Sequence, residues 1–282
     1  MKHISSRDNP LFKQLKKLAA SVRERKKTQK TLLDGVHLVS VYLDRIGVPE
    51  MSAVAASMQE KPEIQALVAR LPENRLAILE DSLFAEISTV ESATGIAAVI
   101  SIPQPTRDGE ASFCVMLEAI QDPGNMGSIL RSAAAAGCDL AYLSPDCVDA
   151  WSPKVLRAGM GAHFSLVLRE EADLVKTARE FPGKTLATSL NARKSLYDCD
   201  LTGAVAFIIG NEGAGVSPGL LDAAGETVLI PMPGGTESLN AGAAAAICLF
   251  ERVRQILIPQ GSGTLVKGQA QHPRHNQRPK HG

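Results

Sequence analysis

The sequence predicts an α/β protein whose second part is built around a parallel sheet. Short runs of consecutive apolar residues alternate there with helical segments, and such runs are typical of strands that are buried on both faces. Polar, glycine-rich segments follow several of these runs, as expected for loops that leave the carboxyl ends of parallel strands.

The first hundred residues mix helix and strand patterns and predict a smaller α/β domain over residues 1–105. Asn9 and Pro10 open an amphipathic helix whose apolar stripe includes Leu11, Leu15 and Leu18. Further strands are expected at 31–33, 52–56, 76–79 and 96–102, with helices at 35–43 and 62–70. Two prolines, a glycine and several charges make 103–111 the best candidate for a linker.

The second part, residues 112–258, alternates strands and helices. Strands are expected at 113–120, 140–144, 165–168, 185–189, 205–209 and 228–230, and helices at 126–137, 153–159 and 171–180. A last helix, about 241–256, carries Ile247, Phe250, Val253 and Ile256 on one side. Residues 259–282 have little apolar content and are predicted to be a disordered basic tail.

Basic residues gather at both ends of a chain whose formal net charge is zero. Residues 1–30 contain ten Lys or Arg against two acids, Asp8 and Glu24. Such clusters fit a phosphate-bearing partner, although a solvated surface or a tail has the same pattern.

Several functional classes are excluded by what the sequence lacks. No run of about eighteen apolar residues could span a membrane, and the first ten residues do not form a secretory signal, so a cytoplasmic protein is expected. The five Cys form no CxxC pair and no His stands at ligand spacing from them, which predicts buried free thiols and no metal site. The absence of a P-loop and of a GxGxxG after the first strand of the second part excludes P-loop enzymes and nucleotide-dependent oxidoreductases.

Three polar, glycine-rich segments carry the candidate chemistry. They are 121–131, 209–215 and 230–240, and each follows a predicted strand. Taken singly, each could be only a helix cap or a turn. Together they favour one binding site at the carboxyl edge of the sheet.

These segments resemble the SpoU (TrmH-like) family of RNA ribose 2′-O-methyltransferases within the SPOUT superfamily. The resemblance covers the second part of the chain, and segment 230–240 is its most specific portion. Residues 33–39 are similar to the opening motif of the small RNA-binding domain that many members carry, with Asp34 where Glu is usual. The resemblance therefore implies an RNA substrate-binding domain at 1–105 and a catalytic domain at 112–258.

The resemblance also implies features that the residue pattern alone does not indicate. The C-terminal domain would be a SPOUT-type α/β domain with a deep trefoil knot, and two copies would pack as a homodimer. The cofactor would be S-adenosylmethionine, bound in the knotted region. By position, the cofactor-binding residues are Thr188, Gly210, Ile230, Met232 and Leu239.

The catalytic residues that the resemblance implies are Asn125, Arg131, Glu212, Ser238 and Asn240. A ribose 2′-hydroxyl is a poor nucleophile and must meet the methyl group in line. Arg131 is the activator proposed for the family, but arginine holds its proton firmly, so phosphate anchoring and electrostatic stabilisation form its alternative role. Asn125 would orient the ribose or Arg131, and the other three would hold the loops and the target nucleotide.

The predicted function is S-adenosylmethionine-dependent methyl transfer to a ribose 2′-hydroxyl of structured RNA. Ribosomal RNA is favoured over transfer RNA because of the appended N-terminal domain. The alternatives are a transfer RNA 2′-O-methyltransferase and a catalytically silent RNA-binding protein of the same fold. One departure from the family is the run Ala241-Gly242-Ala243-Ala244, where members often have a β-branched residue or Ser.

Overall fold

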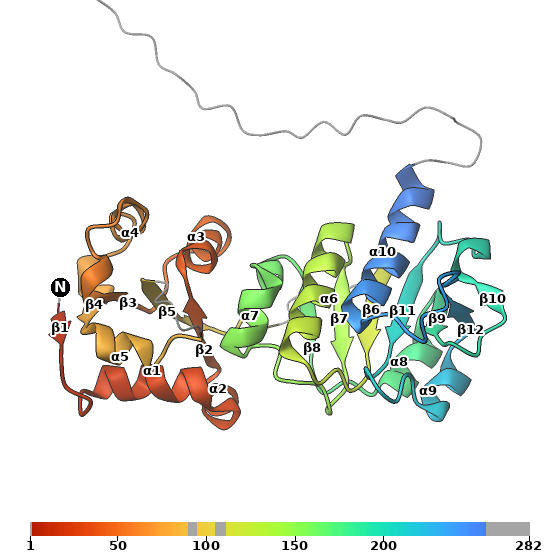
Figure 1. Cartoon of the computed structure of the whole chain (residues 1–282), viewed down its shortest axis with the longest axis horizontal. Coiled ribbons are helices and arrows are strands. Elements are labelled where there is room, and N and C mark those ends of the chain that lie inside the picture. The colour runs from red at the N-terminus through yellow and green to blue at the C-terminus, as the bar shows by residue number, and fades with distance from the viewer. Residues whose placement is uncertain (1, 90–94, 105–110, 258–282) are drawn as a thin grey trace, which may run out of the picture.

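A computed structural model describes residues 2–89, 95–104 and 111–257 and shows two domains side by side, each with its own sheet (Figure 1). This confirms the predicted α/β class. None of the helices in these ranges has the length and apolar character needed to span a bilayer. The predicted tail at 259–282 and most of the predicted linker lie outside the described residues.

The N-terminal domain is a mixed five-stranded sheet with helices on both faces. The strand order is β1 (Lys2–Ile4), β4 (Leu76–Leu79), β3 (Met51–Ala55), β5 (Ile96–Ser101) and β2 (Lys30–Asp34). Strands β1 and β3 run parallel to β4, whereas β5 is antiparallel to β3 and β2. The helices are α1 (Pro10–Ala20), α2 (Val22–Thr28), α3 (Val36–Arg45), α4 (Pro62–Val68) and α5 (Asp81–Ala85).

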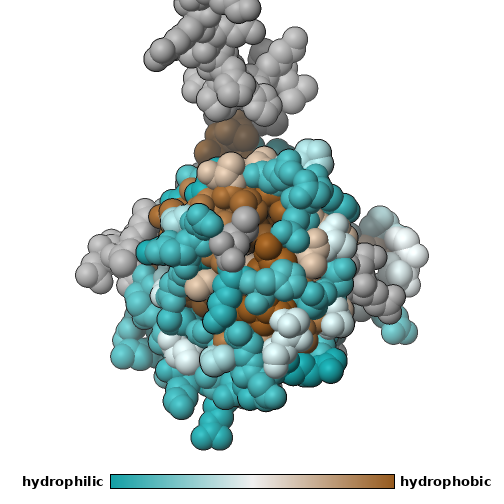
Figure 2. All heavy atoms as spheres, turned by 90° about the vertical axis from the view of Figure 1, so that its left-hand side faces the viewer, coloured by the Kyte–Doolittle hydropathy of each residue, from teal (hydrophilic) through white to brown (hydrophobic). Residues whose placement is uncertain are grey.

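Helices α1 and α5 cover one face of this sheet, and α3 and α4 cover the other. Helix α1 begins as predicted, because the Asn9 side chain accepts a hydrogen bond from the Leu11 amide at 2.9 Å. Its buried residues are Phe12, Leu15 and Leu18. Seen from the β1 end, hydrophilic residues surround a central group of hydrophobic ones (Figure 2).

The C-terminal domain is a seven-stranded sheet in which every neighbouring pair is parallel, as predicted. Its order is β10 (Lys194–Ser195), β12 (Glu226–Leu229), β9 (Lys184–Thr188), β11 (Val205–Ile209), β6 (Phe113–Leu117), β7 (Leu140–Leu143) and β8 (Val167–Arg169). The helices are α6 (Pro123–Ala136), α7 (Pro153–Gly159), α8 (Leu174–Glu180), α9 (Pro218–Ala223) and α10 (Ala241–Leu257).

Alternate residues of the central strands serve two separate cores. Ala206 and Ile208 of β11 pack with α8 and α9, whereas Val205, Phe207 and Ile209 pack on the side of α6, α7 and α10. This second core continues into the N-terminal domain through residues of β2 and α3. The two domains therefore share one hydrophobic core.

The structure differs from the prediction in its shortest elements and in the face that α10 buries. Elements β1, α2, α5, β10 and α9 were not expected from the periodicity, since each has seven residues or fewer. On α10, Phe250 and Ile256 are 45% and 44% exposed, whereas Ala245, Cys248 and Leu249 are buried. Small residues face inward because α10 packs closely on α6, where a Cβ on Gly242 would lie 3.1 Å from the Ser128 hydroxyl.

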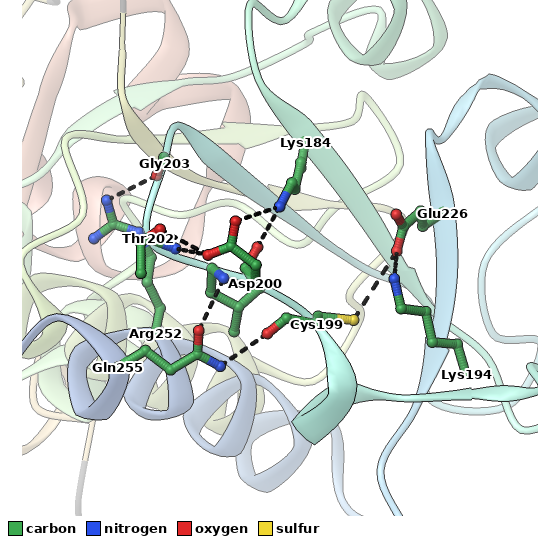
Figure 3. A network of polar contacts seen from close by, with 10 residues as sticks. Lys184, Lys194, Cys199, Asp200, Thr202, Gly203, Glu226, Arg252 and Gln255 are labelled. Atoms are coloured by element: carbon green, nitrogen blue, oxygen red, sulfur yellow. Dashed lines mark hydrogen bonds and ion pairs between the residues drawn. The ribbon is translucent and has the colours of Figure 1, made fainter. Parts of the chain in front are cut away.

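Polar contacts hold the carboxyl half of α10 against the segment between β10 and β11 (Figure 3). The buried Gln255 side chain donates to the Cys199 carbonyl and accepts from the Leu201 amide, both at 2.9 Å. Arg252 donates to the Gly203 carbonyl at 3.3 Å, and its guanidinium lies 4.1 Å from the centre of the Phe113 ring. These contacts explain why a polar residue, Gln255, lies on the buried side of the helix.

Candidate active site

The three polar segments of the sequence meet at the carboxyl edge of the seven-stranded sheet. They follow β6, β11 and β12, and because these strands are parallel their carboxyl ends lie at one edge. A cavity of about 430 Å³ opens there. Its size is within the range of small-molecule binding sites, roughly 300–1,000 Å³.

All five residues predicted to contact the cofactor line this cavity: Thr188, Gly210, Ile230, Met232 and Leu239. Residues 209–216 line the cavity together with the apolar residues Val228, Ile230 and Met232. A cavity lined by apolar side chains and a glycine-rich loop, with Glu212 and Glu237 as its acidic groups, suits a ligand that carries an adenine ring and a positively charged sulfonium chain. The residues present therefore fit S-adenosylmethionine.

The 209–215 loop is a tight turn held by Asn211. The Asn211 and Gly215 backbones exchange hydrogen bonds of 3.0 and 2.9 Å, and the Asn211 side chain accepts from the amides of Gly213 and Ala214. A Cβ on Gly210 would lie 2.2 Å from the Gly215 carbonyl carbon. Gly210 is thus required by the packing of its own loop, besides lining the cavity.

Glu212, Asn125 and Asn240 connect the three segments through hydrogen bonds. The Asn125 amide nitrogen donates to Glu212 Oε1 at 3.0 Å, and the Asn240 amide nitrogen donates to Asn125 Oδ1 at 2.7 Å. The Glu212 carboxylate also accepts from the backbone amides of Gln121 and Asp122, at 3.3 and 3.2 Å. One side chain from each segment is therefore held in a fixed orientation.

These contacts determine the charge of Glu212. Partial burial raises the pKa of its carboxyl, but the hydrogen bonds from Asn125 and from the Asp122 and Gln121 amides outweigh that effect and hold the pKa below the ordinary value of 4.5. Glu212 is consequently ionised at neutral pH. It orients its neighbours as a fixed anion and is unsuited to donating a proton.

Helices α6 and α10 begin at this site. Their N-terminal caps leave the side-chain amides of Asn125 and Asn240 free to form the hydrogen bonds described above. Asp122 caps α6 by accepting from the Asn125 amide at 2.7 Å, so the Asn125 side chain bonds to Glu212 instead of capping. Asn240 caps α10 by accepting from the Gly242 and Ala243 amides at 2.9 and 3.2 Å. Its amide nitrogen remains for Asn125.

Ser238 and Arg131 are placed differently from these three residues. Ser238 lines the cavity together with Glu212, while Asn125, Arg131 and Asn240 lie outside its lining. Arg131 is exposed, two turns into α6, and no hydrogen bond or ion pair joins it to another of the described residues. Its guanidinium is therefore available to a ligand.

Sequence reasoning missed several residues of the site. Ser189, Leu190 and Asn191 line the cavity directly after β9, and their position after a predicted strand was the available signal. Glu118 accepts from the amide and hydroxyl of Ser217 at 2.7 and 2.6 Å, which anchors the loop before α9. Ala119 has a left-handed backbone (φ 51°), a strained conformation that the Ser144 hydroxyl supports by accepting from its amide.

The described residues contain no group of three or more His, Cys, Asp or Glu placed to hold a metal ion. All five cysteines are free, and four of them are buried. The polar groups at the site are amides, hydroxyls, the carboxylates of Glu212 and Glu237 and, on α6 outside the cavity lining, the Arg131 guanidinium. Such a set suits the orientation of a ribose and a phosphate beside the cavity.

Each of the two domains matches a known protein family. Residues 112–250 match the SpoU rRNA Methylase family, and residues 9–98 match the MRM3-like substrate binding domain. An uncharacterized tRNA/rRNA methyltransferase from Synechocystis is 33% identical over 89% of this chain and 93% of its own length. The 23S rRNA (guanosine(2553)-2′-O)-methyltransferase RlmP of Bacillus subtilis is 31% identical over 89% of this chain and 98% of its length.

A solved structure is similar to this chain over most of its length. The SpoU methyltransferase AviRb from Streptomyces viridochromogenes, in complex with the cofactor AdoMet, superposes with a TM-score of 0.78 at 26% identity. The match covers 88% of this chain and 98% of AviRb.

Proposed function

The chain belongs to the SpoU rRNA methylase family and is an RNA 2′-O-ribose methyltransferase that uses S-adenosylmethionine, and we propose that its substrate is large-subunit ribosomal RNA. The observation that carries the proposal is the pairing of a SpoU domain with an MRM3-like substrate binding domain. The Bacillus subtilis relative, which shares nearly its full length with this chain, acts on 23S rRNA.

In this proposal the C-terminal domain binds the cofactor in the cavity and supplies the chemistry. S-adenosylmethionine, when bound, supplies an electrophilic methyl group. Glu212 holds the Asn125 amide, Asn125 orients the target ribose, and Ser238 and Asn240 hold the loop at the cavity entrance. The exposed Arg131 guanidinium stabilises the developing charge of the 2′-oxygen or holds the adjacent phosphate.

We further propose that the protein is a homodimer that pairs through α10. On this helix Phe250, Ile256 and Leu257 are 45%, 44% and 63% exposed. Tyr197, which lines a second cavity together with Ile256, is 51% exposed. Large apolar side chains grouped on one helix are typical of a surface that another protein covers. The trefoil knot stays a prediction from the family resemblance.

The proposed substrate is tested by mapping 2′-O-methyl sites in total RNA from cells with and without the gene. Loss of one site in large-subunit ribosomal RNA is the expected result. Loss of a site in transfer RNA would refute the substrate and support the transfer RNA alternative. Calorimetry with S-adenosylmethionine addresses the silent alternative, because a protein that kept only RNA binding would not bind the cofactor.

A further inference from the structure

A buried ion pair joins the two domains. Arg25 on α2 donates from Nε to Asp149 Oδ2 at 2.7 Å, and the two side chains are only 3% and 6% exposed. Arg25 Nη1 also donates to the carbonyl of Leu18 at 2.6 Å and to that of Ala19 at 3.3 Å. The guanidinium is thus held by both domains and is not accessible to RNA phosphates.

The loop that contains Asp149 makes further buried contacts at the same interface. The Thr31 hydroxyl of β2 donates to the Trp151 carbonyl at 2.6 Å, and Asp149 Oδ1 accepts from the Trp151 amide at 3.0 Å. His163 Nε2 lies 2.8 Å from the Ala150 carbonyl, and its ring packs on Trp151. Three successive residues of this loop are therefore fixed by their surroundings.

The other half of the same loop is bonded to the catalytic segment after β6. The Val148 amide donates to the Ile120 carbonyl at 2.8 Å, and the Gln121 side chain donates to the Asp146 carbonyl. The backbone amide of Gln121 in turn donates to Glu212. A short path of hydrogen bonds and adjacent backbone residues therefore connects the N-terminal domain to the carboxylate that orients Asn125.

Helix α2 lies at the same edge of the C-terminal sheet as the active-site cavity. Asp149 and Glu171, its partners, follow the carboxyl ends of β7 and β8, and the cavity lies at the carboxyl ends of β9, β11 and β12 in the same parallel sheet. Helix α2 therefore docks at the edge that holds the active site, at the junction of the domains in Figure 1.

We propose that Arg25 is a positioning residue: its ion pair with Asp149 sets the N-terminal domain against the loop that supports Gln121, so that bound RNA reaches the methyl-transfer site in one orientation. A buried ion pair adds little stability compared with a well-packed apolar contact, but its directional bonds specify one geometry. The inference rests on the proposed function, and it takes the N-terminal domain, which matches a substrate binding domain, as the part that holds the RNA.

The test compares four variants with the unmodified full-length protein, using ribosomal RNA isolated from cells that lack the gene as the probe. The variants are Arg25→Met, Asp149→Asn, the double variant, and Lys26→Met as the control. Lys26 is a matched control because it lies on the same helix and bridges the same interface through an exposed ion pair with Glu171.

Arg25→Met and Asp149→Asn should each lower turnover at saturating RNA by about 10- to 100-fold, because a misplaced substrate loses productive alignment. The affinity for S-adenosylmethionine should stay within about twofold, and the double variant should be no slower than the slower single variant. Lys26→Met should keep turnover within about threefold, as expected for an exposed pair.

A folded Arg25→Met or Asp149→Asn protein with unchanged turnover would overturn the proposal. So would losses that follow the melting temperatures of the variants and disappear when the assay is cooled, since they would reflect stability alone. If Arg25→Met does not fold, Asp149→Asn decides the question on the same criteria, because it keeps the shape of the side chain. Failure of the unmodified protein to methylate the RNA would instead count against the proposed substrate.

Discussion

At the residue scale, the site depends on which polar residues cap the helices and which side chains thereby stay free to bond to one another. Asp122 caps α6, and this frees the Asn125 amide to bond to Glu212 and to Asn240. Glu212 accepts three hydrogen bonds and keeps its negative charge. Hydrogen bonds to Glu212 and Asn240 therefore hold the Asn125 side chain in its orientation.

Glu212→Gln should therefore lower turnover at every pH tested. The pKa of the carboxyl lies below 4.5, so Glu212 is ionised throughout pH 6–9 and its loss acts equally across that range. We expect a loss of about tenfold or more, since the amide cannot accept all three hydrogen bonds with the strength of a carboxylate. A loss that appears only on one side of pH 7 in a pH–rate profile would contradict this.

Arg131→Ala should reduce turnover by about 10²–10⁴-fold, with affinities for cofactor and RNA largely kept, if the guanidinium acts on the 2′-hydroxyl. If Arg131 only holds a phosphate, the change should appear as weaker RNA binding with a shallower salt dependence. Turnover and RNA binding measured across salt concentrations separate the two roles. Full activity and full affinity together would exclude both.

At the scale of elements, close helix packing depends on individual glycines. Helices α6 and α7 approach closely at Gly127, where a Cβ would lie 2.4 Å from the Ala158 Cβ and 2.7 Å from the Val155 carbonyl oxygen. Helices α6 and α10 also approach at Gly242, where a Cβ would lie 3.1 Å from the Ser128 hydroxyl oxygen. Since α6 carries Asn125 and Arg131, its placement between these neighbours positions the catalytic candidates.

Gly127→Ala should destabilise the protein by about 1–3 kcal/mol, because the added methyl group has no space between α6 and α7. Gly219 offers a matched control, since it is also helical but a Cβ there would meet nothing within 4 Å. Gly219→Ala should be neutral or slightly stabilising. Thermal unfolding of the two variants checks both statements, and equal melting temperatures would refute the packing argument.

The exposed apolar residues of α10 make a prediction about assembly. Replacing Phe250 and Ile256 together by Glu should convert a dimer to a monomer, because charged side chains oppose the burial of an apolar surface. Light scattering at micromolar concentration measures the change. A control pair of exposed substitutions, Lys13→Glu and Lys17→Glu on α1, should leave the mass unchanged.

At the scale of the whole molecule, the domains share a hydrophobic core and several buried polar contacts. Beside these contacts, within the C-terminal domain, lies His163, which is 3% exposed and packs on Trp151. Burial lowers the pKa of His163 from 6.5 to about 4, although the Ala150 carbonyl and Asp149 oppose the shift. The folded protein thus keeps this residue neutral at neutral pH.

The protein should therefore lose stability as the pH falls from about 6.5 to about 4. In this window the unfolded chain binds a proton at His163 and the folded protein does not, which lowers the free energy of unfolding by up to roughly 3 kcal/mol. His163→Met should flatten the dependence of melting temperature on pH in this range. An unchanged slope would show that other groups cause the acid sensitivity.

The sequence by itself determined the parallel sheet, the position of its main strands and the three polar segments. Apolar runs such as 205–209 can be buried only between two layers of helices, and glycine-rich segments after them can lie only at the carboxyl edge. The residues that line the cavity after 209 and 230 were identifiable for this reason, together with the family resemblance.

Only the tertiary structure decided which neighbour each polar residue contacts and how the domains meet. The buried face of α10 follows from close packing on α6 and from the bonds of Gln255, which the periodicity of Phe250 and Ile256 does not reveal. Arg25 is one of ten basic residues in the first thirty, and local sequence cannot distinguish it from those exposed to solvent. Its partner Asp149 lies 124 positions away, and such pairings depend on how separate elements are brought together in space.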